Sequence, residues 1–214
     1  MTKLEMYAPP ADAAKPLSPT ELLASLRSAL QPWQPGSPFW IFAYGSLMWN
    51  PSFTFDARHV ATIRGYHRSF RVWSRINRGT PEKPGLVLTL ECGGSCRGLV
   101  YRIPADLVQE QMNLIWKREM NYGSYRPKWL NCAVGGESIR ALAFTVNRQC
   151  SGYAGQLPIE AVVEAIASAK GRYGPAHDYL FRTTETLREH GIRDSNVEQL
   201  ASLVRARMAA PKAA

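Results

Sequence analysis

One carboxylate in this sequence stands where an apolar side chain is expected. Between residues 104 and 122 apolar positions recur at helical spacing, which predicts a helix that stops at Gly123. The seam of this helix consists of Val108, Met112, Ile115, Glu119 and Tyr122. A carboxylate that faces a protein core loses solvation, which raises its pKa and its basicity. The position marks Glu119 as a candidate general base, although a structural ion pair with a buried Arg explains it equally well.

A second candidate is a small-residue turn at the end of an apolar run. Residues 40–44 are apolar or aromatic and predict a buried strand, which Gly45-Ser46 interrupts. Gly permits backbone angles that are closed to other residues, so the turn can point several backbone N–H groups in one direction. Such a group of donors suits a carboxylate or an oxyanion. A plain junction between a strand and a turn has the same sequence pattern.

Other catalytic and metal-binding arrangements find little support. The close cysteine pair, Cys92 and Cys96, has no second pair of matching spacing, and no His lies near Cys132 or Cys150. We therefore expect reduced thiols, no metal and no organic cofactor. Ser46 is not part of a Gly-x-Ser-x-Gly elbow. The histidines are scattered and form no catalytic triad: His59, His67, His177 and His190.

Length and composition predict a soluble domain. The chain has 214 residues, of which 45% are hydrophobic, enough for one domain with a full core. We expect a cytoplasmic protein without a membrane partner, because no apolar window reaches the length of a membrane span and residues 1–16 lack a secretory core. The net charge of +9 comes from scattered residues without a nucleic-acid motif. The excess positive charge equally suits a small anionic substrate, and we expect no nucleic-acid partner.

The order of the expected helices and strands predicts an α+β fold, and the sequence contains no internal repeat. Residues 1–38 are an extension with one helix, for which Ser18, Pro19 and Glu21 form a capping box. A single domain is expected over 39–208, followed by a tail at 209–214. Strands are expected at 66–74, 85–90, 98–103, 128–134 and 139–146, with a hairpin turn at Gly93-Gly94. Helices are expected at 104–122, 158–170, 176–190 and 195–208, the last with a capping box formed by Ser195 and Glu198.

Four ordered motifs resemble those of the ChaC-type γ-glutamylcyclotransferases. They are Tyr44-Gly45-Ser46-Leu47 before Met48-Trp49, the loop 78–85, Trp116-Lys117-Arg118-Glu119 before Asn121-Tyr122, and Asn147-Arg148 with Tyr153. Together they cover roughly residues 38 to 205. The resemblance implies a small mixed β-barrel flanked by helices. Asn77 departs from the pattern, since many relatives have His before the Arg-Gly pair.

The resemblance also implies a lyase-type reaction. Glutathione would be cleaved to 5-oxoproline and Cys-Gly, with Glu119 as general base and acid and without a cofactor. The expected substrate-binding residues are Ile41, Phe42, Ala43, Tyr44, Gly45, Ser46, Leu47, Arg75, Arg78 and Tyr153. Arg75 and Arg78 are candidates for the glycyl carboxylate because a guanidinium can bind it through two hydrogen bonds, although an exposed arginine is the commoner interpretation. Tyr153 resembles a family substrate contact, and a loop-packing aromatic is the alternative. The same cyclisation of other γ-glutamyl amines or amino acids is an alternative, as is a non-catalytic regulator of cation transport. The oligomeric state stays open.

Overall fold

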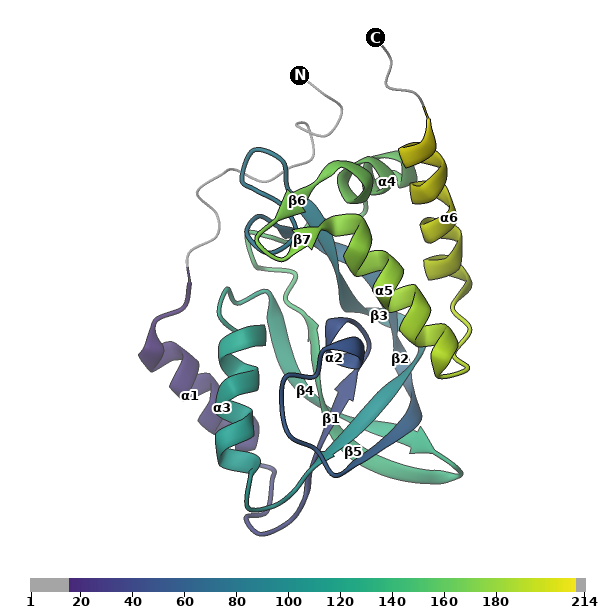
Figure 1. The fold of residues 1–214 in the computed structure, drawn as a ribbon. Helices are drawn as coiled ribbons and strands as arrows, with labels where there is room; N and C mark the ends of the chain where they lie inside the picture. Colours follow the sequence, from purple (N-terminus) through teal and green to yellow (C-terminus); the bar gives the residue numbers. More distant parts are fainter. Residues whose placement is uncertain (1–15, 211–214) are drawn as a thin grey trace. The chain divides into compact units, whose positions relative to one another are not determined.

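The computed structural model describes residues 16–210, which form two compact units (Figure 1). The barrel unit contains residues 16–69 and 89–150, and the helical unit contains residues 70–88 and 151–210. Each unit is therefore built from two separate stretches of chain. The single domain expected over 39–208 stays a prediction, and most of the tail at 209–214 lies outside the described residues.

The barrel unit is organised by a closed sheet. Its strands are β1 (Phe39–Ala43), β2 (Ala57–Ser74), β3 (Gly85–Ile103), β4 (Tyr125–Val134) and β5 (Glu137–Val146), in the order β1-β3-β2-β4-β5. Residues 70–74 of β2 and 85–88 of β3 belong to the helical unit. β1 runs antiparallel to β3 and parallel to β5, which makes the barrel a mixed one. This confirms the expected α+β fold with a small mixed β-barrel flanked by helices.

β1 is the most deeply buried strand of the barrel. Phe39, Ile41, Phe42 and Ala43 have no exposed surface. A glycine on β3 allows the close approach of the two strands, because a Cβ at Gly98 would lie 2.3 Å from the Ala43 carbonyl oxygen and 2.8 Å from the Phe42 ring. The turn that follows β1 therefore starts from a fixed point of the core.

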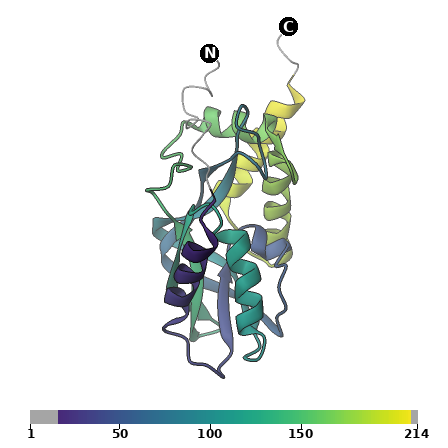
Figure 2. The ribbon, with the colours of Figure 1, turned by 90° about the vertical axis from the view of Figure 1, so that its left-hand side faces the viewer.

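Three helices belong to the barrel unit: α1 (Pro19–Leu30), α2 (Ser46–Trp49) and α3 (Val108–Glu119). The capping box of α1 is confirmed, since Ser18 and Glu21 bond to each other's backbone N–H. α1 and α3 lie side by side in both views (Figures 1 and 2), where the Trp116 indole donates a hydrogen bond of 2.7 Å to the Ser25 hydroxyl. The helix of the N-terminal extension thus packs on the helix that carries Glu119.

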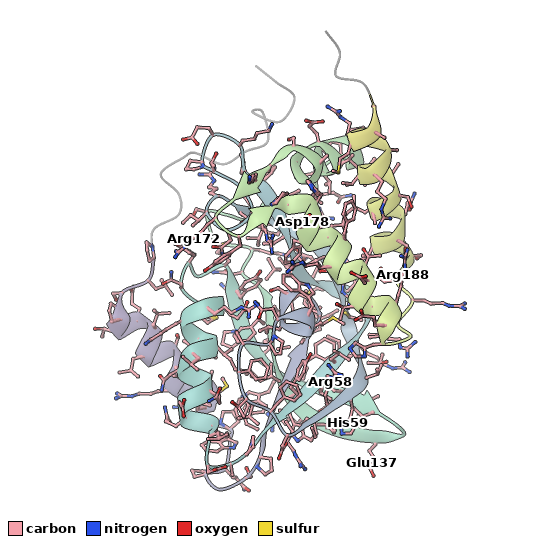
Figure 3. The ribbon with its side chains drawn as sticks, viewed as in Figure 1. Arg58, His59, Glu137, Arg172, Asp178 and Arg188 are labelled. Carbon is pink, nitrogen blue, oxygen red and sulfur yellow. The ribbon has the colours of Figure 1, made fainter. Side chains whose placement is uncertain are left out.

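The helical unit is built from α4 (Ile159–Ser168), α5 (Ala176–Glu189) and α6 (Ser195–Ala209), which pack on one another. A two-stranded sheet, β6 (Lys170–Gly171) with β7 (Gly174–Pro175), connects α4 to α5. Arg188, labelled in Figure 3, joins α5 to α6 through a hydrogen bond of 2.7 Å from its Nε to the Glu198 carboxylate.

Several expected details are wrong. No hairpin forms at Gly93-Gly94, because β3 runs continuously through both residues, each with positive φ. The pair lies inside the strand and does not reverse it. The cap of α6 is Asp194, whose carboxylate accepts from the Val197 N–H, and not Ser195. α3 begins at Val108 because residues 105–107 form a turn.

Candidate active site

Glu119 is the last residue of α3, and its side chain is largely buried. Val108, Met112 and Ile115 on the same seam are buried, and only 13% of the Glu119 side chain is exposed. Burial raises the pKa of the Glu119 carboxyl, and the neighbouring Arg118 cation opposes this shift. The carboxylate therefore has the environment expected of a general base.

Arg118 joins Glu119 to the turn after β1. Its Nε lies 3.0 Å from Oε1 of Glu119, and its Nη2 donates a hydrogen bond of 3.0 Å to the Ser46 hydroxyl. Nη1 donates to the Asn50 carbonyl at 2.5 Å and to the Ser52 hydroxyl at 2.6 Å. A single guanidinium thus holds the candidate base beside the Gly45-Ser46 turn. The expected Arg partner of Glu119 exists, but it is the preceding residue and is 26% exposed, not a buried core arginine.

The turn itself opens a short helix that the sequence did not predict. The Gly45 carbonyl accepts from the Met48 N–H at 2.9 Å, and the Ser46 carbonyl accepts from the Asn50 N–H at 2.8 Å. The first N–H groups of a helix have no acceptor within that helix. Gly45 has a φ of −133° and a ψ of −131°, a pair outside the α and β regions that other residues adopt. Glycine also leaves the space beside those N–H groups free of a side chain.

The other residues of the 41–47 stretch support the turn from inside the barrel. Ile41, Phe42 and Ala43 are fully buried, while Tyr44 and Leu47 are 7% and 6% exposed. The Tyr44 hydroxyl donates a hydrogen bond of 2.7 Å to the Phe144 carbonyl. Because these side chains are used in packing, they position the turn.

Arg68 has a supporting role that sequence reasoning missed. Its Nε donates to the Tyr44 carbonyl at 2.7 Å and its Nη2 to the Arg97 carbonyl at 2.6 Å, so it anchors the residue that precedes the turn. The sequence contains a signal for this role, because side chains of β2 alternate between an inward and an outward face. Arg68 lies on the inward face together with Phe70 and Val72, which are both buried. A cation at an inward position indicates a buried acceptor.

A model of the ChaC-like protein family matches residues 39–207. The chain belongs to this family. A relative from Escherichia coli named glutathione-specific γ-glutamylcyclotransferase is 34% identical over 178 residues, which cover 83% of this chain and 77% of the relative. Human glutathione-specific γ-glutamylcyclotransferase 1 is 31% identical over 200 residues, 90% of each chain. A solved yeast γ-glutamyl cyclotransferase specific to glutathione shares the fold, with a TM-score of 0.76, 20% identity, and coverage of 83% of this chain and all of that one.

The remaining expected contacts of this ChaC-like chain, Arg75, Arg78 and Tyr153, lie in the helical unit and not in the unit that contains Glu119. Both arginines are buried, at 5% and 7% exposure. Arg78 Nη1 donates to the carbonyls of Tyr173 and Pro175 at 2.6 and 3.2 Å, and burial lowers the pKa of its guanidinium. Tyr153 forms a β-bridge with Val72. In this arrangement Arg78 fixes the β6–β7 segment.

The Gly79 backbone explains the rest of the 78–85 motif. A Cβ at Gly79 would lie 2.3 Å from the Gly85 nitrogen and 2.5 Å from the Ser74 carbonyl oxygen, so only glycine allows this loop to close. The motif is therefore a packing element of the helical unit.

Within residues 16–210 no three His, Cys, Asp or Glu side chains are grouped so that they could hold a metal ion, and the four cysteines are free thiols. No helix in this range is long and apolar enough to cross a membrane.

Proposed function

We propose that the protein is a γ-glutamylcyclotransferase that converts glutathione into 5-oxoproline and Cys-Gly. The observation that carries the proposal is the buried Glu119 carboxylate, held by Arg118 beside the Gly45-Ser46 turn. Membership of the ChaC-like family supports it, as do the names of the bacterial and human relatives.

The reaction is an intramolecular aminolysis in which Glu119 moves the protons. Its carboxylate accepts a proton from the α-ammonium of the γ-glutamyl residue, and the free amine attacks the γ-carbonyl carbon. Glu119 returns this proton to the cysteinyl nitrogen, and the amide C–N bond breaks as the tetrahedral intermediate collapses. The attacking nitrogen loses its second proton in the same step, and the Cys-Gly amine takes up that proton and leaves as an ammonium. No water is consumed. A carboxyl whose pKa is raised by burial suits both directions of transfer at neutral pH.

The turn after β1 supplies positioning and charge stabilisation. We assign the backbone N–H groups of residues 45–47 to the substrate α-carboxylate or to the tetrahedral oxygen, because the first N–H groups of a helix lack acceptors within it. Holding the γ-glutamyl chain folded back on itself makes the attack effectively unimolecular. No enzyme nucleophile is needed.

Arg118 tunes and holds the base. Its positive charge opposes the effect of burial on the pKa of Glu119, which keeps the carboxylate available as a base. Its contact with the Ser46 hydroxyl fixes the distance between the base and the turn. We retain Arg75, Arg78 and Tyr153 as proposed substrate contacts, although the Arg78 hydrogen bonds to two backbone carbonyls favour a structural role for that residue.

The test is the release of 5-oxoproline when purified protein is incubated with glutathione. Equal or faster turnover of γ-glutamyl-alanine would favour the alternative of a broader γ-glutamyl substrate range. A folded protein that releases 5-oxoproline from neither compound would favour the non-catalytic alternative. We place the activity in the cytoplasm, where thiols stay reduced, in keeping with the four free cysteines.

A further inference from the structure

A basic hollow of about 250 Å³ opens in the barrel unit, and neither Glu119 nor the Gly45-Ser46 turn lines it. Its walls come from β2, β3, β4, β5 and the turn that follows β5. The residues that matter here are Tyr66, Leu90, Arg126, Lys128, Val146 and Arg148. We infer that the hollow binds the carboxylate or phosphate group of a small anionic molecule.

Positive charge in the hollow exceeds negative charge. Arg148 is paired with the buried Glu91, at 3.0 Å from its Nε to Oε2. Arg126 instead donates to two neutral amides, at 3.1 Å to Asn147 Oδ1 and 2.5 Å to Gln149 Oε1. The Lys128 ammonium donates to the neutral Tyr66 hydroxyl at 3.1 Å. Two cations of the hollow are thus held by neutral groups, which leaves their charge for an anion.

The two cations are also held in place for binding. Alternate residues of a strand point to the same side, so Arg126 and Lys128 project from β4 together. The amide contacts use two of the five N–H donors of Arg126, and the phenol contact uses one of the three donors of Lys128. An arginine fixed by such contacts loses little entropy when it binds a carboxylate or phosphate through two parallel hydrogen bonds.

The chain connects the hollow to the candidate base. Arg126 follows Glu119 by seven residues. The turn that holds Arg126 is bonded to the segment between them, because the Asn147 N–H donates to the Ser124 carbonyl and the Asn147 side chain donates to the Gly123 carbonyl, both at 2.9 Å. An anion in the hollow would therefore order the segment that leads away from Glu119.

Two sources supply an anion of this chemistry. One is the glycyl carboxylate of glutathione, in which case the inference rests on the proposed function. The other is a separate small anion, such as inorganic phosphate, that binds independently of the substrate. Either anion would bind to Arg126 and Lys128. Only in the first case does binding of glutathione in the hollow depend on its glycyl carboxylate.

Calorimetric titration of the full chain tests the inference. The Glu119→Gln background slows turnover during the titration, and Arg126→Gln and Lys128→Met are added to it singly. The ligands are glutathione, glutathione with its glycyl carboxylate converted to a carboxamide, and inorganic phosphate. Arg64→Gln is the matched control, because Arg64 is an exposed arginine of β2 that does not line the hollow. Melting temperatures verify that each variant is folded.

We expect each hollow variant to weaken binding of the anionic ligand about 10–100-fold, the effect of losing a hydrogen bond to a charged group. If the variants lose affinity for glutathione but not for its carboxamide, the substrate carboxylate is the occupant of the hollow. If they lose affinity for phosphate alone, the occupant is a separate anion. Equal loss for glutathione and its carboxamide without loss for phosphate overturns the inference, as does no loss beyond that of Arg64→Gln. Release of 5-oxoproline by the unmodified protein is measured separately, so failure of the proposed function is recognised independently.

Discussion

Replacing Glu119 by glutamine removes the proposed proton acceptor and keeps the shape of the side chain. General base catalysis typically contributes about 10²–10⁴-fold to a rate, so 5-oxoproline release should fall by this factor. Binding of glutathione should persist, because Glu119 moves protons and does not grip the peptide. The variant therefore separates chemistry from recognition.

The expected change in stability follows from the contacts of Arg118. The glutamine Oε1 can still accept from Arg118 Nε, and the guanidinium keeps its three other acceptors, on Ser46, Asn50 and Ser52. The substitution therefore replaces a hydrogen bond between charged groups by one to a neutral amide, which costs about 1 kcal/mol. Relief from burying a charge acts in the opposite direction. We expect the melting temperature to change by no more than about 2–4 °C.

If Glu119 has a purely structural role, the substitution should lower the stability of the protein and leave the chemistry of the folded protein unchanged. Removing one partner of a deeply buried pair costs about 3–5 kcal/mol, or roughly 6–20 °C in melting temperature for a chain of this size. Melting and 5-oxoproline release should be measured on the same preparation. A stable Glu119→Gln protein that turns over glutathione at the unmodified rate refutes the assignment of Glu119 as the base.

Three further predictions concern the surroundings of the base. Arg118→Met removes the cation that lowers the pKa of Glu119, so the acidic limb of the pH profile of kcat/KM should move to higher pH; an unmoved limb would contradict the coupling. Gly45→Val should lose activity, because a side chain at this position covers the N–H groups of the turn; unchanged kcat and KM in a variant whose melting temperature shows that it is folded would count against the turn. Treatment with EDTA should leave activity intact, and loss restored by zinc would show that a metal is required.

Sequence reasoning succeeded where the signal is local. The capping box of α1 needs only Ser18 and Glu21, three residues apart, and its geometry is confirmed. The seam of α3 is likewise a matter of spacing, and the burial of Val108, Met112 and Ile115 follows from it. The mixed barrel was reached through the family resemblance, since pairing of β1 with β3 and β5 joins residues far apart in sequence.

Sequence reasoning failed where one local signal is compatible with two structures. Gly93-Gly94 has the composition of a hairpin turn, but these two glycines with positive φ lie inside a continuous strand. Asp194 and Ser195 are both good helix caps, and the choice between adjacent residues depends on which one points at the first free N–H. Neither choice is decided by the residues alone.

The partners of the arginines show a deeper limit. Arg78 resembled a substrate contact because it stands in a family motif, yet its acceptors are backbone carbonyls about a hundred residues later in the chain. For Glu119 the sequence offered a choice between a general base and a structural ion pair. The contacts of Arg118 show that the two interpretations are compatible. The cation that pairs with Glu119 also lowers the pKa of its carboxyl and donates a hydrogen bond to Ser46 in the turn. An ion pair of this kind is therefore part of what makes the carboxylate usable as a base, and its presence does not count against catalysis.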